Sequence, residues 1–197
     1  MKLRMLNGTH SMLAYVSFHC GHRYVRDVMN DKILSSLVIR QLQIAAQTLK
    51  PIKGIDYNNY AKSLILRFSN PEIAHETFQI AMDGSEKMQQ RIFYPLKDAI
   101  SLNLNIRPFA FAIAAWLRHI SQSKHDCAPY ELRDPIADQL TPLPKERSAH
   151  SILDYLSRIG FLIDDLKEDK MFWGQVSDIL NDMLCKPMKS VVEQEII

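Results

Sequence analysis

The spacing of apolar residues constrains this chain most, because it follows a helical period almost throughout. Met12, Val16 and Cys20 recur at steps of four, and Tyr60, Leu64 and Phe68 repeat the pattern farther on. Such steps mark the buried stripe of an α-helix, whereas a half-buried strand alternates apolar and polar residues. Clear period-2 alternation appears nowhere. The sequence therefore predicts an all-α fold, a single multi-helical domain over residues 1–197.

The stop and start signals divide this domain into helices. Asp31 and Asp56 are typical N-caps, and Asn70 followed by Pro71 is a typical helix start. The helix predicted after Pro108 has apolar residues on nearly all of its sides, which is typical of the central helix of a domain. The predicted helices cover 9–29 with an interruption at Gly21, 31–50, 56–68, 71–83, 85–101, 107–122, 145–159, 162–168 and 171–185, with a proline-rich loop over 123–144.

Composition excludes several classes of protein. The net charge is only +2, so basic and acidic residues are too nearly balanced for an obvious nucleic-acid-binding or membrane-surface protein. The six glycines are scattered, with no two within ten positions, so neither a dinucleotide fingerprint nor a P-loop is present. The longest apolar run, 109–117, is short for a membrane helix, and the first residues are not those of a signal peptide. We expect a soluble, cytoplasmic protein.

The first candidate site is Lys2, Asn7 and His10, in which the last two share a helical face. A lysine amine removed from water can exchange a proton, an asparagine amide can donate to a developing oxyanion, and a histidine can orient a hydroxyl. These groups suit carbonyl chemistry. The plainer alternative is a solvated terminal lysine, a capping asparagine and a helix histidine.

Three blocks of the chain carry a resemblance to a known family. KLRMLNGTHS (2–11) resembles the active-site motif of the polyol-specific long-chain dehydrogenases, the mannitol dehydrogenase family. RFSNPEIAHETFQIAMDGSEKMQQR (67–91) is similar to a second block of that family, closest to its fructuronate reductase (D-mannonate oxidoreductase) branch. IGFLIDDLKEDKMFWGQVSDIL (159–180) is similar to its C-terminal helices.

This resemblance implies that the chain is the helical C-terminal half of a two-domain, NAD-dependent oxidoreductase. NAD would be bound mainly by an N-terminal Rossmann domain outside this chain. Lys2 would be the general acid/base, Asn7 would polarise the carbonyl oxygen, and His10 would orient the substrate. The substrate would be a sugar acid or polyol, with D-mannonate/D-fructuronate favoured.

Lys87 and Arg91 form a second candidate site, for substrate binding. They are one turn apart after Gly84-Ser85, so both are expected near the positive end of a helix dipole, where a carboxylate is favoured. A sugar acid has that carboxylate and mannitol lacks it. The alternative is a solvated basic face. His75 and Gln79 share one face of the preceding helix and are interpreted either as packing residues or as residues that support the site from behind those that touch the substrate. Asp83 is interpreted as the end of that helix.

The remaining polar clusters favour no metal. His19, Cys20 and His22 lack the four ligands and paired spacing of a structural zinc site, so a helix end with solvent-facing histidines is expected. Cys127 and Cys185 have no nearby base and are expected to be inert.

A competing hypothesis is a non-enzymatic helical interaction module. A helical half without its partner would expose an apolar patch, which would favour self-association.

Overall fold

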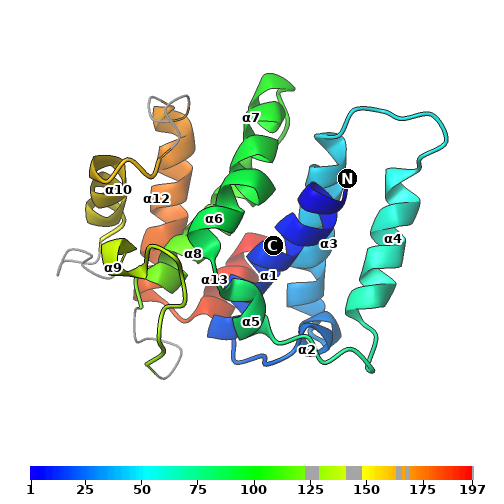
Figure 1. The fold of residues 1–197 in the computed structure, drawn as a ribbon, viewed down its shortest axis with the longest axis horizontal. Helices are drawn as coiled ribbons and strands as arrows, with labels where there is room; N and C mark the ends of the chain where they lie inside the picture. The colour runs from blue at the N-terminus through cyan, green and yellow to red at the C-terminus, as the bar shows by residue number, and fades with distance from the viewer. Residues whose placement is uncertain (123–128, 141–147, 163–165, 167–168, 197) are drawn as a thin grey trace.

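The computed structural model describes residues 1–122, 129–140, 148–162, 166 and 169–196, and its regular structure is helical (Figure 1). No strand occurs in these ranges, which contain one isolated bridge between Tyr24 and Glu76. The predicted all-α class is confirmed. In chain order the elements are η1 (Leu3–Gly8), α1 (Thr9–His19), α2 (Val25–Asn30), α3 (Lys32–Gln47), α4 (Tyr57–Phe68), α5 (Thr77–Ala81), α6 (Gly84–Met88), η2 (Gln89–Phe93), α7 (Tyr94–Ser101), α8 (Arg107–Ile120), α9 (Ala137–Leu140), α10 (Ala149–Arg158), α12 (Lys170–Cys185) and α13 (Met188–Ile196), where η marks a π-helix.

Helix α8 is the centre of the domain, as its apolar sequence predicts. Every residue from Pro108 to Ile120 is buried. Helix α12 packs along α8, and α1 and α3 also contact it. In Figure 1, α10 and α12 lie on one side of the molecule and α3 and α4 on the other. The core is therefore built around one helix that has no exposed face over these residues.

The two aspartate caps are formed as predicted. The Asp31 carboxylate accepts hydrogen bonds from the backbone N–H groups of Ile33 and Leu34, at 2.9 and 3.1 Å. Asp56 does the same for the first turn of α4. Each cap satisfies N–H groups that the helix itself leaves without a partner.

The helix predicted over 71–83 is wrong in its first half. The Asn70 side chain accepts from the N–H of Glu72 and forms a turn, and regular helix is confined to α5. Before α5 the chain pairs with the segment that follows α1: the N–H of Val25 donates to the His75 carbonyl at 3.1 Å. The N–H of Thr77 donates to the Arg23 carbonyl at 2.9 Å. Pairing with a distant segment thus overrides the local helix signal.

The ends of other helices also differ from expectation. Helix α6 begins at Gly84, and Ser85 is not its cap: the N–H and hydroxyl of Ser85 both donate to Asp134. Helix α9 lies within the expected loop, and α13 was not predicted. Residues 123–128, 141–147, 163–165 and 167–168, which include parts of that loop and of two expected helices, lie outside the described residues.

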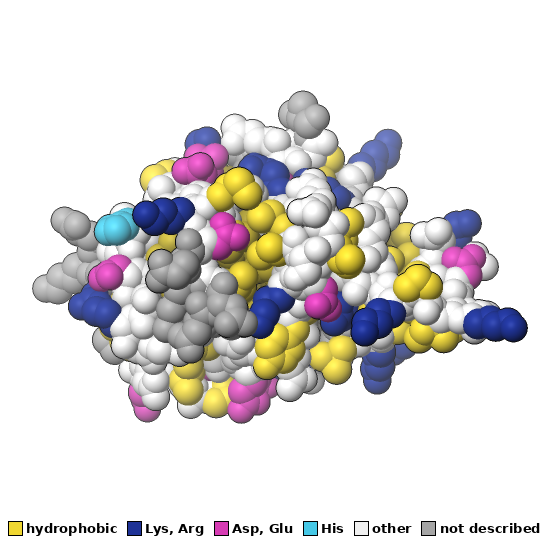
Figure 2. Space-filling view, turned by 90° about the horizontal axis from the view of Figure 1, so that it is seen from above, with side chains coloured by type: hydrophobic (Ala, Val, Ile, Leu, Met, Phe, Trp, Pro, Cys, Tyr) yellow, Lys and Arg dark blue, Asp and Glu magenta, His cyan; other side chains and the backbone are white. Residues whose placement is uncertain are grey.

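Several large hydrophobic side chains stay exposed on the surface. Met1, Leu3, Tyr94 and Leu102 are each more than two-fifths exposed. Seen from above, hydrophobic patches lie between scattered charged side chains (Figure 2). In the described ranges, no helix combines the length and apolarity needed to span a membrane.

Candidate active site

The N-terminal helix carries the first three candidate residues. Lys2 precedes η1, Asn7 lies in η1, and His10 lies in the first turn of α1. A Cβ on Gly8 would lie 2.7 Å from the carbonyl oxygen of Arg91, so glycine lets η1 approach the backbone of η2 this closely. This crossing brings the Asn7–His10 turn beside Arg91.

Two hollows open along this turn. The first has a volume of about 230 Å³ and the second about 410 Å³. The first is lined by Lys2, Leu6, Asn7, His10, Val25, Arg67, Phe68, Ile73 and His75. The second is lined by Asn7, His10, His75, Gln79, Ile80, Met82, Asp83, Lys87 and Arg91. Asn7, His10 and His75 line both, and we call these three the shared wall. Together the hollows are large enough for a small polar molecule.

All five candidate residues therefore line one or both of two adjoining hollows. Lys2 lies at the first hollow, Lys87 and Arg91 lie at the second, and Asn7 and His10 lie on the wall between them. The Lys2 side chain is exposed. Sequence reasoning missed Arg67, His75 and Gln79 as lining residues, although all three fall within the second family block.

The two imidazoles of the shared wall contact each other. The His10 ring lies on Phe68, with ring centroids 4.4 Å apart, and meets His75 edge-on at 5.5 Å. Burial lowers the pKa of His10 to about 3, with help from His75 and two nearby arginines. Burial also lowers the pKa of His75, as do Arg67 and Lys87. Both rings are thus neutral near pH 7, and each offers one donor and one acceptor nitrogen.

Arg91 is held in place by a buried hydroxyl. Its Nη1 donates to Ser11 Oγ at 3.1 Å, and Ser11 is fully buried on α1. Burial lowers the pKa of Arg91, while Tyr15 and Asp83 raise it, and an arginine stays cationic at neutral pH. One edge of the guanidinium is fixed, and the side chain faces the second hollow.

Lys87 does not lie where its helix position predicts. Its ammonium donates to the Met82 carbonyl at 2.5 Å, and Asp83 Oδ2 lies 3.4 Å away. The Lys87 ammonium therefore lies at the Met82 carbonyl, just beyond the end of α5, and not at the positive N-terminal end of its own helix. Asp83 is the one carboxylate among the described residues that line the hollows, which also hold Lys2, Arg67, Lys87 and Arg91. The region carries an excess of positive charge.

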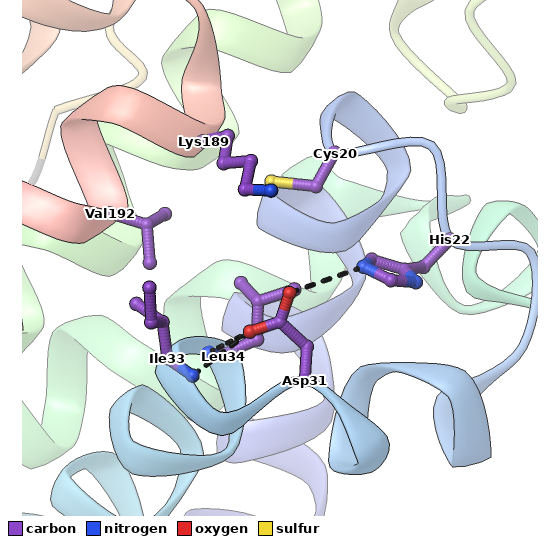
Figure 3. A pocket seen from close by; sticks show the side chains of 7 residues that line it. All are labelled: Cys20, His22, Asp31, Ile33, Leu34, Lys189 and Val192. Atoms are coloured by element: carbon purple, nitrogen blue, oxygen red, sulfur yellow. Dashed lines mark hydrogen bonds and ion pairs between the residues drawn. The ribbon is translucent and has the colours of Figure 1, made fainter.

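The histidines near Gly21 do not both face solvent, contrary to expectation. His19 is 3% exposed and packs edge-on against Phe18 and Tyr130. Burial is the main reason that its pKa is lowered to about 2. His22 lies 3.8 Å from Asp31 at a separate pocket that Cys20 and Lys189 also line (Figure 3). Within the described ranges, no three His, Cys, Asp or Glu side chains are grouped so as to hold a metal ion. Cys185 is exposed, and Cys127 lies outside the described residues.

The fold and the two hollows define an all-helical domain with one polar, cation-rich site. The profile of the mannitol dehydrogenase C-terminal domain matches residues 1–184, and the chain belongs to this family. The predicted resemblance is confirmed.

Individual relatives agree with this assignment. The chain is 35% identical to D-mannonate oxidoreductase of Escherichia coli over 90% of its length, and 32% identical to mannitol 2-dehydrogenase of Aspergillus oryzae over 92%. It spans only 37% and 36% of those proteins. Mannitol 2-dehydrogenase of Pseudomonas fluorescens, solved as a ternary complex with NAD and D-mannitol, has the same fold over the whole chain, with a TM-score of 0.89 and 23% identity. The match covers 40% of that structure.

Proposed function

We propose that this chain is the catalytic and substrate-binding half of an NAD-dependent dehydrogenase that interconverts a secondary alcohol and a ketone. The substrate is a sugar acid, with D-mannonate/D-fructuronate favoured over a neutral polyol. The observation that carries the proposal is the shared wall: Asn7 and His10 stand between a hollow that holds Lys2 and a hollow that holds Arg91.

The residues divide the chemistry among them. During oxidation the Lys2 amine takes the hydroxyl proton while the carbinol carbon loses a hydride, and reduction runs in reverse. The Asn7 amide donates to the oxygen as it gains carbonyl character. The neutral His10 imidazole hydrogen-bonds a hydroxyl of the substrate and fixes its orientation. A bound nicotinamide supplies the hydride acceptor or donor.

The charge of the second hollow supports a sugar acid. A carboxylate can accept hydrogen bonds from the free edge of Arg91, and such charge-assisted bonds are about twice as strong as neutral ones. The Lys87 ammonium adds positive charge, but it already donates to the Met82 carbonyl and forms an ion pair with Asp83. We therefore assign the carboxylate to Arg91 first and to Lys87 second.

NAD would be bound mainly by a separate Rossmann half. The residues of this chain fit the substrate side of the reaction, and its scattered glycines form no turn for a pyrophosphate. The relatives are more than twice as long as this chain, which agrees with a second half. Lys2 is exposed between the exposed Met1 and Leu3, so docking of that half over this end would remove Lys2 from water.

Two measurements test the proposal. This chain joined to a Rossmann half, called the assembled enzyme below, should reduce D-fructuronate with NADH at least about tenfold more efficiently than D-fructose, since one charged hydrogen bond contributes about 1.5–3 kcal/mol. Absence of turnover with both would overturn the proposed reaction, and equal kcat/KM values would overturn the preference for an acid. Calorimetry on the isolated chain should detect no micromolar binding of NADH. Such binding would contradict the assignment of the cofactor to another half.

A further inference from the structure

We propose that His75 is a substrate-binding residue of this site, which donates or accepts a hydrogen bond at a hydroxyl on the carbon chain of the sugar acid. The inference rests on the proposed function and adds a residue to it. Its basis is a juxtaposition: the His75 ring stands on the wall between both hollows, edge-on to His10.

The backbone around His75 is fixed although it is not helical. The His75 carbonyl accepts from Val25 N–H, and the next pair of the bridge joins Thr77 N–H to the Arg23 carbonyl. Neighbouring side chains in extended backbone point to opposite sides. Accordingly Glu76 turns outward to Arg23, with 2.8 Å between Oε1 and Nη2, while His75 lines the hollows. The imidazole is thus aimed by the bridge to the α1–α2 segment.

The ring nitrogens of His75 are available to a ligand. Among the described residues, neither nitrogen has a hydrogen-bond or ion-pair partner. The same holds for the ring of His10, which is packed between Phe68 and His75. Both side chains are only partly buried, and neither is among the buried side chains whose polar atoms lack a partner. Because both rings line the two hollows, a ligand there can reach their nitrogens.

The chemistry of the ring suits a hydroxyl. Burial lowers the pKa of His75, and the nearby Arg67 and Lys87 lower it further, so the ring keeps one N–H donor and one acceptor nitrogen. A hydroxyl both donates and accepts, so it can bind either nitrogen. His10 and His75 therefore present two neutral imidazoles to neighbouring hydroxyls, whereas the carboxylate is bound farther along by Arg91.

Steady-state kinetics of the assembled enzyme with D-fructuronate and NADH tests this role. His75→Phe keeps a ring against His10 but removes both nitrogens, and His75→Gln keeps a hydrogen-bonding group without the ring. We expect His75→Phe to raise KM for D-fructuronate about 5- to 100-fold, as the loss of a buried hydrogen bond does. His75→Gln should restore KM to within about fivefold of wild type, because the lost bond is partly replaced. KM for NADH and the melting temperature should stay unchanged in both variants.

His150→Gln, at an exposed histidine on α10, is the matched control and should behave as wild type. Unchanged KM for D-fructuronate in His75→Phe would overturn the role. Equal KM values in the Phe and Gln variants, or a melting temperature lowered in both, would assign His75 to packing instead. If the wild-type assembled enzyme turns over neither D-fructuronate nor D-fructose, the proposed function itself fails and this role falls with it.

Discussion

The two hollows of the site share a wall but hold their positive charges in opposite ways. At the first hollow, Lys2 and Arg67 are exposed, and within the described ranges the Lys2 ammonium has no hydrogen-bond or ion-pair partner. At the second hollow, Arg91 is half-buried and tied to Ser11, and Lys87 is tied to Met82 and Asp83.

This difference suits two separate tasks in the proposed reaction. A group that exchanges a proton must change its charge during each turnover, and its surroundings can be completed by another domain. A group that binds a carboxylate performs best when its position is fixed before the substrate arrives. We infer that the first hollow serves the reaction and the second serves recognition, with neutral imidazoles between them.

Replacing Lys2 should produce the largest effect. In the assembled enzyme, Lys2→Ala should lower kcat by about 10²–10⁴-fold with little change in KM, because it removes a general acid/base. Stopped-flow and steady-state measurements of NADH oxidation would provide both constants. Lys53→Ala, in the exposed turn before α4, is the control. A kcat within threefold of wild type would assign the proton transfer to another group.

Replacing the two arginines tests the division between the hollows. Arg91→Met should raise KM for D-fructuronate by about 10- to 100-fold, since a charged hydrogen bond is lost, and should leave KM for D-fructose nearly unchanged. Arg67→Met, at the exposed first hollow, should raise KM for the acid much less. A larger rise in KM for D-fructuronate in Arg67→Met than in Arg91→Met would mean that the carboxylate binds in the first hollow.

The neutral shared wall makes a prediction about pH. The folded pKa of His10 is about 3, below the value near 6.5 expected in the unfolded chain, so the unfolded state binds the extra proton as pH falls below 6.5. Its contribution to stability is complete above pH 6.5 and declines toward pH 3. Between pH 7 and 5.5 this histidine should account for a loss of about 1 kcal/mol.

Urea unfolding of the isolated chain at both pH values measures this loss. His10→Phe should lose about 1 kcal/mol less than wild type over that interval, because its ring cannot take up a proton. Lys53→Ala, which leaves every histidine in place, should lose as much as wild type. The same loss in His10→Phe as in wild type would show that His10 is not held neutral.

Removing the anchor of Arg91 should produce the smallest effect. Ser11→Ala deletes one neutral-to-charged hydrogen bond, and KM for D-fructuronate should rise only a few-fold. Ser17→Ala, which removes a buried hydroxyl bonded within α1 to the Leu13 carbonyl, is the control. A KM effect as large as that of Arg91→Met would mean that Ser11 touches the substrate itself.

Local sequence signals predict much of the fold. Asp31 and Asp56 cap helices through their own first turns, and the all-apolar run of α8 can only be buried. Residues 71–76 carry equally good local signals for a helix, yet the chain is extended at His75 and Glu76, where its backbone pairs with the segment after α1. Local sequence signals do not show pairing with a segment about 50 residues away, so this extended conformation could not be predicted.

The site divides in the same way. Asn7 and His10 share one side because consecutive helical turns bring them together, which their spacing alone predicts. His75 reaches that side only through the bridge to Tyr24, and Lys87 turns to the carbonyls after α5 only because α5 ends there. Helical spacing predicts where the first candidates lie, whereas the positions of His75 and Lys87 depend on their tertiary partners.

A crystal structure of the assembled enzyme with NAD and D-mannonate tests the central claim most directly. We predict the reacting hydroxyl within about 3.2 Å of the Lys2 amine, as a proton-transfer pair requires, with the carboxylate hydrogen-bonded to Arg91 in the second hollow. A carboxylate bound at Arg67, or a reacting hydroxyl out of reach of Lys2, would contradict this account.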